Sequence, residues 1–341
     1  MAKLYNDKLK QTNGSEHAFA PIVRILGKGK TGSRSLDREE ARSAMAMILS
    51  GETTDVQLGA FLMLLRVKEE SEQELAGFVE ATRDYIKAPE DIAVDLDWSS
   101  YAGKKRQLPW FLLSCFLLAD NGVRIYMHGA SGHTPGRLYT ESVLNFFNIP
   151  LAEDWSQARQ QLQQQHFAFM PLSALCPPLQ HIIELREQLG LRSPVHTLAR
   201  LINPLAAAHS MQSVFHPAYA STHQGAAQLL GQANAVVFKG EGGEIERKPE
   251  ATCTVRAIVD GRATEEHWDK LLQGRQPIAP HLDMQAMADL WSGTTSNNYG
   301  EMAVLGTTAI TLKMLGKANT QTAAMALAQQ LWQQRNIRRF D

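Results

Sequence analysis

Residues 36–84 read "LDREEARSAMAMILSGETTDVQLGAFLMLLRVKEESEQELAGFVEATRD" and contain three helix starts in succession. Each start places Asp, Thr or Ser three residues before Glu or Gln, which is the spacing of a capping box. The pairs are Asp37 with Glu40, Thr54 with Gln57, and Ser71 with Glu74. Apolar residues follow each start at helical spacing. The stretch therefore predicts an all-helical unit over residues 19–88, preceded by a polar arm over residues 1–18.

The pattern changes after Pro89, where strands begin to alternate with helices. An apolar helix, "LPWFLLSCFLLADNG", lies between the first two of four predicted strands, which cover residues 92–97, 122–129, 166–171 and 233–240. Alternation of this kind predicts a mostly parallel α/β sheet. In such sheets ligands bind beyond the carboxyl ends of the strands, so the segments that follow the strands are candidate sites.

The bulk composition limits the possible functions. A chain of 341 residues is long enough for two packed units. Its formal net charge is −1, so any attraction to a polyanion must come from local clusters of cations. The three cysteines have no metal-site spacing, and no segment resembles a signal peptide or a membrane span. We therefore expect a cytoplasmic protein.

A first cluster of cations lies between residues 22 and 35, without an intervening acid. Its members are Arg24, Lys28, Lys30 and Arg34, with glycines between them. The segment lacks the spacing of a P-loop and could be a solvated connector between two helices. Four cations on phosphates would nevertheless release counterions and give real affinity, which favours a phosphate-backbone contact.

A second cluster follows the first predicted strand, and a third follows the second strand. Lys104, Lys105 and Arg106 precede a helix start, where free N–H groups and the helix dipole favour anions. A charge run is more often a solvated face, which is the alternative. In "HGASGHTPGR" (128–137), His128 could stack on a base or simply be hydrogen-bonded within the turn, and Arg137 is a candidate phosphate ligand.

Residues 36–84 resemble the helical domain of anthranilate phosphoribosyltransferases and the related pyrimidine-nucleoside phosphorylases. The resemblance continues through "MHG" (127–129), "LREQLGLRS" (185–193), "LINPL" (201–205) and "KGEGG" (239–243). It implies an α/β protein of the nucleoside phosphorylase and class III phosphoribosyltransferase type. A small helical domain, joined by about residues 176–205, would pack on a larger α/β domain formed by residues 89–175 and 206–341. Arg192 and Arg200 would then extend a basic face.

Several motifs of that family are altered in this chain. The family's G-T-G-G-D loop wraps the pyrophosphate of phosphoribosyl pyrophosphate, but "DWSSYAGK" (97–104) retains only Gly103. Gln180 replaces the arginine that holds the anthranilate carboxylate. The metal-binding Asp-Glu pair is replaced by Glu244 and Glu246, which are not adjacent, and magnesium is needed for a pyrophosphate leaving group. These changes argue against anthranilate phosphoribosyltransferase activity.

One non-biosynthetic branch of the family, the YbiB type, shows the same losses. "ILGKGKTGSRSLDREEAR" (25–42), "CPPL" (176–179) and "HTLARL" (196–201) resemble its markers. The resemblance implies a homodimer paired through the helical domains that binds single- or double-stranded nucleic acid with little sequence preference. No catalytic residue, cofactor, metal site or membrane contact is assigned. The candidate contacts are Arg24, Lys28, Lys30, Arg34, Lys104, Lys105, Arg106, His128, Gly129, Arg137, Arg192 and Arg200.

An enzyme remains the alternative. The retained fold, His128 with Gly129, Asn203 with Pro204, and the cationic loop at 104–106 would suit a glycosyl- or phosphoribosyltransferase. Such an enzyme would use phosphoribosyl pyrophosphate with magnesium and an acceptor other than anthranilate. Fold alone is weak evidence for either function.

Overall fold

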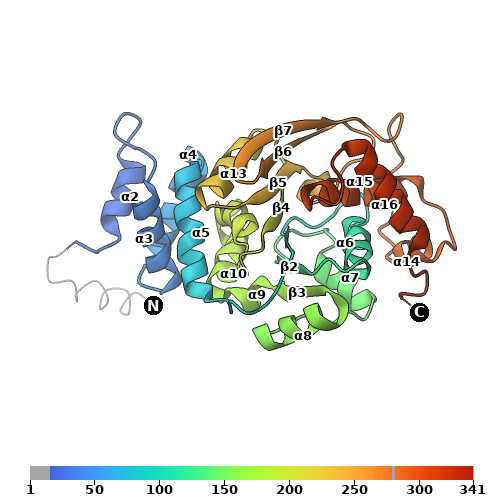
Figure 1. Cartoon of the computed structure of the whole chain (residues 1–341). Coiled ribbons are helices and arrows are strands. Elements are labelled where there is room, and N and C mark those ends of the chain that lie inside the picture. Colours follow the sequence, from blue (N-terminus) through green and yellow to red (C-terminus); the bar gives the residue numbers. More distant parts are fainter. Residues whose placement is uncertain (1–15, 279–280, 341) are drawn as a thin grey trace.

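The computed structural model describes residues 16–278 and 281–340, so most of the predicted polar arm lies outside the described residues. The N-terminal part is helical, as predicted (Figure 1). Its helices are α2 (Ala20–Gly27), α3 (Arg38–Leu49), α4 (Asp55–Lys68) and α5 (Glu72–Ile86). All three capping boxes form with both reciprocal hydrogen bonds, which explains where α3, α4 and α5 begin.

Gly77 lets α3 and α5 approach each other closely. A Cβ atom at this position would lie 2.2 Å from the carbonyl oxygen of Arg38 and 2.8 Å from the backbone nitrogen of Arg42. Both atoms belong to the backbone of α3, so neither can move without shifting the helix. Glycine is therefore required here for packing rather than for backbone conformation.

Replacing Gly77 with alanine should destabilise the fold by about 2 kcal/mol or more, because the added methyl group overpacks a rigid contact. Urea unfolding followed by circular dichroism would measure this loss. Gly59 on α4 is a matched control, since a Cβ atom there meets nothing within 4 Å. Gly59→Ala should instead stabilise the helix by roughly 0.5–1 kcal/mol. Equal effects of the two substitutions would contradict the packing argument.

The α/β part is built on one sheet of seven strands with the order β3-β2-β1-β4-β5-β6-β7. The first five strands in this order are parallel, and β6 and β7 add an antiparallel edge. The strands are β1 (Leu96–Ser100), β2 (Ile125–Gly129), β3 (Phe167–Pro171), β4 (His209–Val214), β5 (Asn234–Lys239), β6 (Cys253–Val259) and β7 (Arg262–Trp268). The mostly parallel α/β sheet is thus confirmed.

The strand predictions need two corrections. The first strand spans Leu96–Ser100 rather than residues 92–97, so residues 92–95 precede it and "WSS" is buried strand rather than loop. Three further strands, β4, β6 and β7, were not predicted. β4 carries Ser210, Gln212 and Ser213 inside the sheet, where buried polar residues hide the usual apolar pattern.

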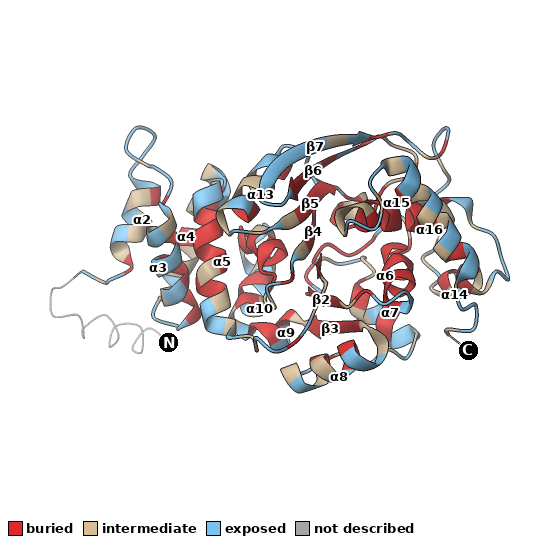
Figure 2. Cartoon of the chain, in the orientation of Figure 1, coloured by how far each residue is buried: buried red, intermediate tan, exposed pale blue. Residues whose placement is uncertain are grey.

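Helices cover both faces of the sheet. The helices that follow the helical part are α6 (Phe111–Asp120), α7 (Thr140–Phe146), α8 (Trp155–Gln165), α9 (Leu172–Leu175), α10 (Pro177–Glu184), α11 (Arg186–Leu189), α12 (Val195–Leu198), α13 (Tyr219–Leu229), α14 (Gln285–Ser292), α15 (Asn298–Met314) and α16 (Gln321–Gln334). Short 3₁₀ turns occur at Ala199–Leu201 and Glu241–Gly243. Figure 2 shows α6 and the central strands largely buried, whereas the edge strand β7 is exposed.

Side chains alternate along the strands and so contribute to two separate cores. Trp98, Met127 and Phe169 pack with α6, α14, α15 and α16 on one face. Tyr126 and Met170 pack on the other face, in a core shared with α3, α4, α5 and α10. The helical part is therefore held to the sheet by a continuous apolar core.

Two further features concern the cysteines and the helices. The three cysteines are all free and buried. No helix within the described ranges is both long and apolar enough to cross a membrane.

Candidate functional site

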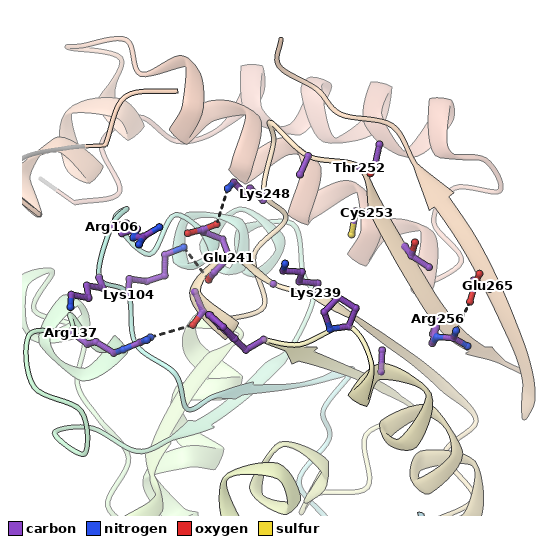
Figure 3. Close-up of a pocket in the computed structure, with 18 residues that line it drawn as sticks. Lys104, Arg106, Arg137, Lys239, Glu241, Lys248, Thr252, Cys253, Arg256 and Glu265 are labelled. Atoms are coloured by element: carbon purple, nitrogen blue, oxygen red, sulfur yellow. Dashed lines mark hydrogen bonds and ion pairs between the residues drawn. The ribbon is translucent and has the colours of Figure 1, made fainter. Parts of the chain in front are cut away.

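A cleft of about 770 Å³ opens at the carboxyl ends of the parallel strands (Figure 3). The loop after β1, the ends of β4 and β5, and the start of β6 form its wall. Seven Lys or Arg side chains line it against two Glu side chains: Lys104, Lys105, Arg106, Arg137, Lys239, Lys248 and Arg256, with Glu241 and Glu265. The exposed ring of Phe215 adds one apolar surface. A net-neutral chain thus concentrates positive charge where ligands bind in parallel sheets.

Several of these cations have no carboxylate partner. Lys248 pairs with Glu250 at 3.0 Å, and Arg256 pairs with Glu265 at 2.9 Å. Among the described residues 16–278 and 281–340, no ion pair involves Lys105, Arg106, Arg137 or Lys239. The side chains of Lys105, Arg106 and Lys239 are exposed. These four side chains supply the uncompensated charge of the cleft.

Arg137 is half-buried and joins the segments that meet at the cleft. Its Nη1 atom donates to the carbonyl oxygens of Ala102, Gly103 and Gly242 at 3.1, 2.9 and 3.2 Å. Figure 3 shows its guanidinium directed toward the segment that carries Glu241. Arg137 therefore remains a candidate phosphate contact, but one whose geometry is fixed by backbone carbonyls.

The loop after β1 binds a carboxylate of the chain itself. The backbone N–H groups of Ala102 and Gly103 donate to Glu244 Oε1 at 2.7 and 2.6 Å. The Ser100 hydroxyl donates to Glu244 Oε2 at 3.0 Å. Glu244 is 1 % exposed, so this carboxylate is sealed within the loop.

The structure contradicts the expectation that Lys104 faces solvent as a phosphate contact. It is 1 % exposed, and its Nζ atom lies 2.5 Å from Glu246 Oε1. Glu246 Oε2 in turn accepts from the backbone N–H of Phe111 at 2.9 Å, at the start of α6. Burial raises the pKa of Glu246 to about 7 against the opposing effect of Lys104. Lys104 therefore borders the cleft only as a member of a buried ion pair, and only Lys105 and Arg106 of this run are exposed.

His128 and Gly129 also need correction, because both lie inside the sheet. They pair with Ser99 and Ser100 of β1, and both are buried. His128 Nδ1 lies 2.6 Å from the hydroxyl oxygen of Tyr101, and a Cβ atom at Gly129 would lie 2.2 Å from the Ser100 carbonyl oxygen. The alternative of a hydrogen-bonded structural histidine therefore describes His128, and neither residue can reach a polyanion on the surface.

Arg200 is also buried, contrary to the expectation that it extends a basic face. It is 8 % exposed, and its Nη1 atom donates to the Gly243 carbonyl oxygen at 2.8 Å and to Ser213. It therefore stabilises the segment behind the cleft rather than extending a basic face. Arg192 is half-buried and donates to Thr134 Oγ1 at 3.2 Å. Burial, reinforced by neighbouring arginines, lowers the pKa of Arg192 to about 10.

The N-terminal cluster lies elsewhere and is only partly a loop. α2 extends to Gly27, so Arg24 is on a helix, where it pairs with Glu16. Arg34 forms a bidentate pair with Glu40 at 2.6 and 2.7 Å, while Lys28 and Lys30 are exposed. Figure 1 shows α2 on the outer side of the helical part, away from the sheet. The structure does not bring this cluster together with the cleft within one chain.

Three lining cations were not predicted. Lys239 is the last residue of β5 and lies at the end of the predicted strand 233–240, so its position at a strand end was a usable signal. Lys248 and Arg256 had no such signal, because the strand β6 was not predicted. No group of three His, Cys, Asp or Glu side chains suited to a metal ion occurs in the part of the chain that the structure describes.

Together the fold and the cleft define an α/β protein with a helical unit and a basic cleft at the carboxyl ends of its strands. Two family models match it: "Glycosyl transferase family, helical bundle domain" over residues 21–86, and "Glycosyl transferase family, a/b domain" over residues 111–334. The chain therefore belongs to glycosyl transferase family 3.

Curated relatives and solved structures agree with this assignment. The Escherichia coli K12 protein YbiB, which is uncharacterized, is 32% identical over 295 residues, covering 78% of this chain and 92% of that protein. Anthranilate phosphoribosyltransferase of Desulfosudis oleivorans is 28% identical over 309 residues, covering 87% and 90%. The Thermus thermophilus anthranilate phosphoribosyltransferase structure matches with a TM-score of 0.76 at 21% identity, covering 93% and 94%. At that identity the structural match shows the fold alone.

Proposed function

We propose that this chain binds the phosphate backbone of nucleic acid, single- or double-stranded, with little sequence preference. The observation that supports this most is the set of unpaired cations Lys105, Arg106, Arg137 and Lys239 in one cleft of the described structure. Cations that contact successive phosphates release counterions, which gives affinity without base recognition. Because the whole chain has a formal net charge of −1, attraction to a polyanion must come from this local excess of positive charge.

The state of the loop after β1 favours this proposal over phosphoribosyl transfer. In the family that this chain resembles, the corresponding loop wraps a pyrophosphate. Here the amides of Ala102 and Gly103 are already bonded to Glu244, and Lys104 is bonded to Glu246. Glu244 and Glu246 lie in the segment that corresponds to the family's metal-binding pair. Because both carboxylates are already bonded within the chain, neither is free to bind magnesium.

A transferase that acts on phosphoribosyl pyrophosphate with magnesium and another acceptor is the second candidate. Membership of the family favours it, as does the match to a Saccharomyces cerevisiae anthranilate phosphoribosyltransferase "in complex with PRPP and Mg" (TM-score 0.76, 15% identity). That likeness concerns the fold. The cationic cleft would then accommodate a small phosphorylated substrate.

We also propose a cytoplasmic homodimer that pairs through the helical parts. Two exposed apolar side chains on α4 support the pairing, because Val56 is 68% exposed and Val67 is 87% exposed. The two residues are eleven positions apart, which places them on one face of the helix. Light scattering of the intact chain should give twice the mass of one chain.

Direct binding distinguishes the two functions. A labelled oligonucleotide of about 30 nucleotides, tested as DNA, RNA and duplex at about 50 mM salt, should bind in all three forms with similar affinity. In parallel, phosphoribosyl pyrophosphate with magnesium should be neither bound nor consumed with a panel of acceptors. Absence of binding to every nucleic acid, together with turnover of phosphoribosyl pyrophosphate, would establish the transferase instead.

A further inference from the structure

Phe215 is a large apolar side chain that the fold leaves exposed at the ligand-binding end of the sheet. It directly follows β4, is 53% exposed, and is not a member of the apolar cores that the described residues form. A single exposed apolar side chain is ordinary on a protein surface. The position of this one, inside the cationic cleft, is what calls for a physical explanation.

The phenyl ring lies among the cations of the cleft. Among the residues that the structure describes, Phe215 is the one aromatic residue that lines it. The last residue of β4 is paired with Lys239, and neighbouring strands lie about 5 Å apart, so Phe215 begins directly beside Lys239. A Cβ atom at Gly243 would lie 3.7 Å from the Phe215 side chain, and Arg137 donates to the carbonyl oxygen of the preceding Gly242. The ring thus shares one wall of the cleft with two cations.

A neighbouring side chain restricts the ring. The centroids of Phe215 and His216 lie 4.9 Å apart with an interplanar angle of 79°, which is an edge-to-face arrangement. This contact limits the rotation of the phenyl group, so less conformational entropy is lost when a flat ligand covers it. The ring is therefore held ready at the cleft before any ligand binds.

An aromatic ring beside phosphate-binding cations suits single-stranded nucleic acid. Every base has a π-face, so stacking of a base on a ring adds affinity without sequence preference. The bases of a duplex are already stacked on one another and paired, so they offer no free face to the ring. The ring therefore provides a contact that an unpaired strand can make and a duplex cannot.

We propose that Phe215 stacks on an unpaired base of a single strand whose phosphates contact Lys239 and Arg137. This inference rests on the proposed binding of nucleic acid and adds base stacking to it. Phosphate contacts alone favour the duplex, which releases about 0.9 counterions per contact against about 0.7 for a single strand. Stacking on Phe215 offsets this difference, so single and double strands bind with similar affinity.

The test removes the ring and the base separately and together. The wild-type chain and Phe215→Ala are titrated with a labelled single strand of about 12 nucleotides, the same strand with an abasic site at every position, and a duplex of equal length. Phe215→Ala should bind the normal single strand about tenfold more weakly than the wild-type chain, and should bind the abasic strand and the duplex within about twofold of it. Its salt dependence should match the wild-type slope, because no phosphate contact is lost.

Two further variants control for the shape and the exposure of the ring. Phe215→Tyr keeps a flat ring and should retain wild-type affinity for the single strand. Phe146, at the end of α7, is 38% exposed and does not line the cleft, so Phe146→Ala should leave all three affinities unchanged. Circular dichroism would establish that each variant is folded.

The outcomes separate this inference from the proposed function. If the wild-type chain binds the strands but Phe215→Ala loses nothing, or loses equally on normal strand, abasic strand and duplex, stacking is overturned while nucleic-acid binding stands. If the wild-type chain binds none of the three ligands, the proposed function fails and the stacking contact fails with it. A loss confined to the strand that carries bases supports stacking.

Discussion

Simultaneous charge reversal of Lys105, Arg106 and Lys239 to glutamate is expected to weaken oligonucleotide binding by on the order of 100-fold or more at about 0.1 M salt. The three side chains line one cleft and have no carboxylate partner in the described ranges, so their substitution breaks no internal ion pair. Each reversal removes a phosphate contact and adds a repulsive charge. Fluorescence anisotropy with a labelled single strand would measure the loss, and circular dichroism would establish that the variant is folded.

The N-terminal cluster provides the matched comparison. Lys28 and Lys30 are also exposed, but they lie beyond α2, outside the cleft. Lys28→Glu with Lys30→Glu should change affinity much less than reversal in the cleft. The opposite ranking, with a large loss at Lys28 and Lys30 and none in the cleft, would place the interface on the helical part.

Replacement of Lys104 by methionine is expected to destabilise the fold by about 3–5 kcal/mol, because it leaves Glu246 buried without its counter-charge. Urea unfolding would measure this loss. The double variant Lys104→Met with Glu246→Gln should regain most of it, since the neutral amide still accepts from the Phe111 N–H. Recovery in the double variant separates the ion pair from simple loss of packing.

The same variant should show a defined dependence on pH. Burial raises the pKa of Glu246 to about 7, above its usual value of 4.5. A folded-state pKa raised in this way means that stability from this group is present below about pH 4.5 and is lost as pH rises through 7. Without Lys104 the folded pKa rises further, so the deficit of Lys104→Met should be larger at pH 8 than at pH 6. A fully stable variant that has lost oligonucleotide binding would contradict the buried pair.

The helical unit could be predicted from sequence because its signals are local. Capping boxes and helical apolar spacing lie close together along the chain, and all three starts formed as expected. The strands were harder to predict. Ser99 and Ser100 occupy the buried strand β1, and Ser210 and Gln212 occupy β4, so polarity indicated loops where the structure has strands.

Part of the cleft lining could be predicted from the sequence, but the pairing of the lining residues could not. The loop after the first strand does border the cleft through Lys105 and Arg106. Lys104, adjacent in sequence, is instead paired with a glutamate 142 positions away, and Glu244 reaches the Ala102 amide across the same separation. No spacing rule reports pairings at that distance. Exposed and buried cations therefore look alike in the sequence, and the burial of Arg200 and His128 was not predictable for the same reason.

The central claim is that this cleft binds a nucleic-acid backbone, and a salt series tests it most directly. The dissociation constant of a labelled single strand would be measured from about 50 to 300 mM salt for the wild-type chain and for the Lys105, Arg106 and Lys239 reversal. The account predicts a steep log–log dependence for the wild-type chain, roughly 0.7 per phosphate contact, and a slope smaller by about 2 for the variant. A flat dependence, or equal slopes for the two proteins, would contradict it.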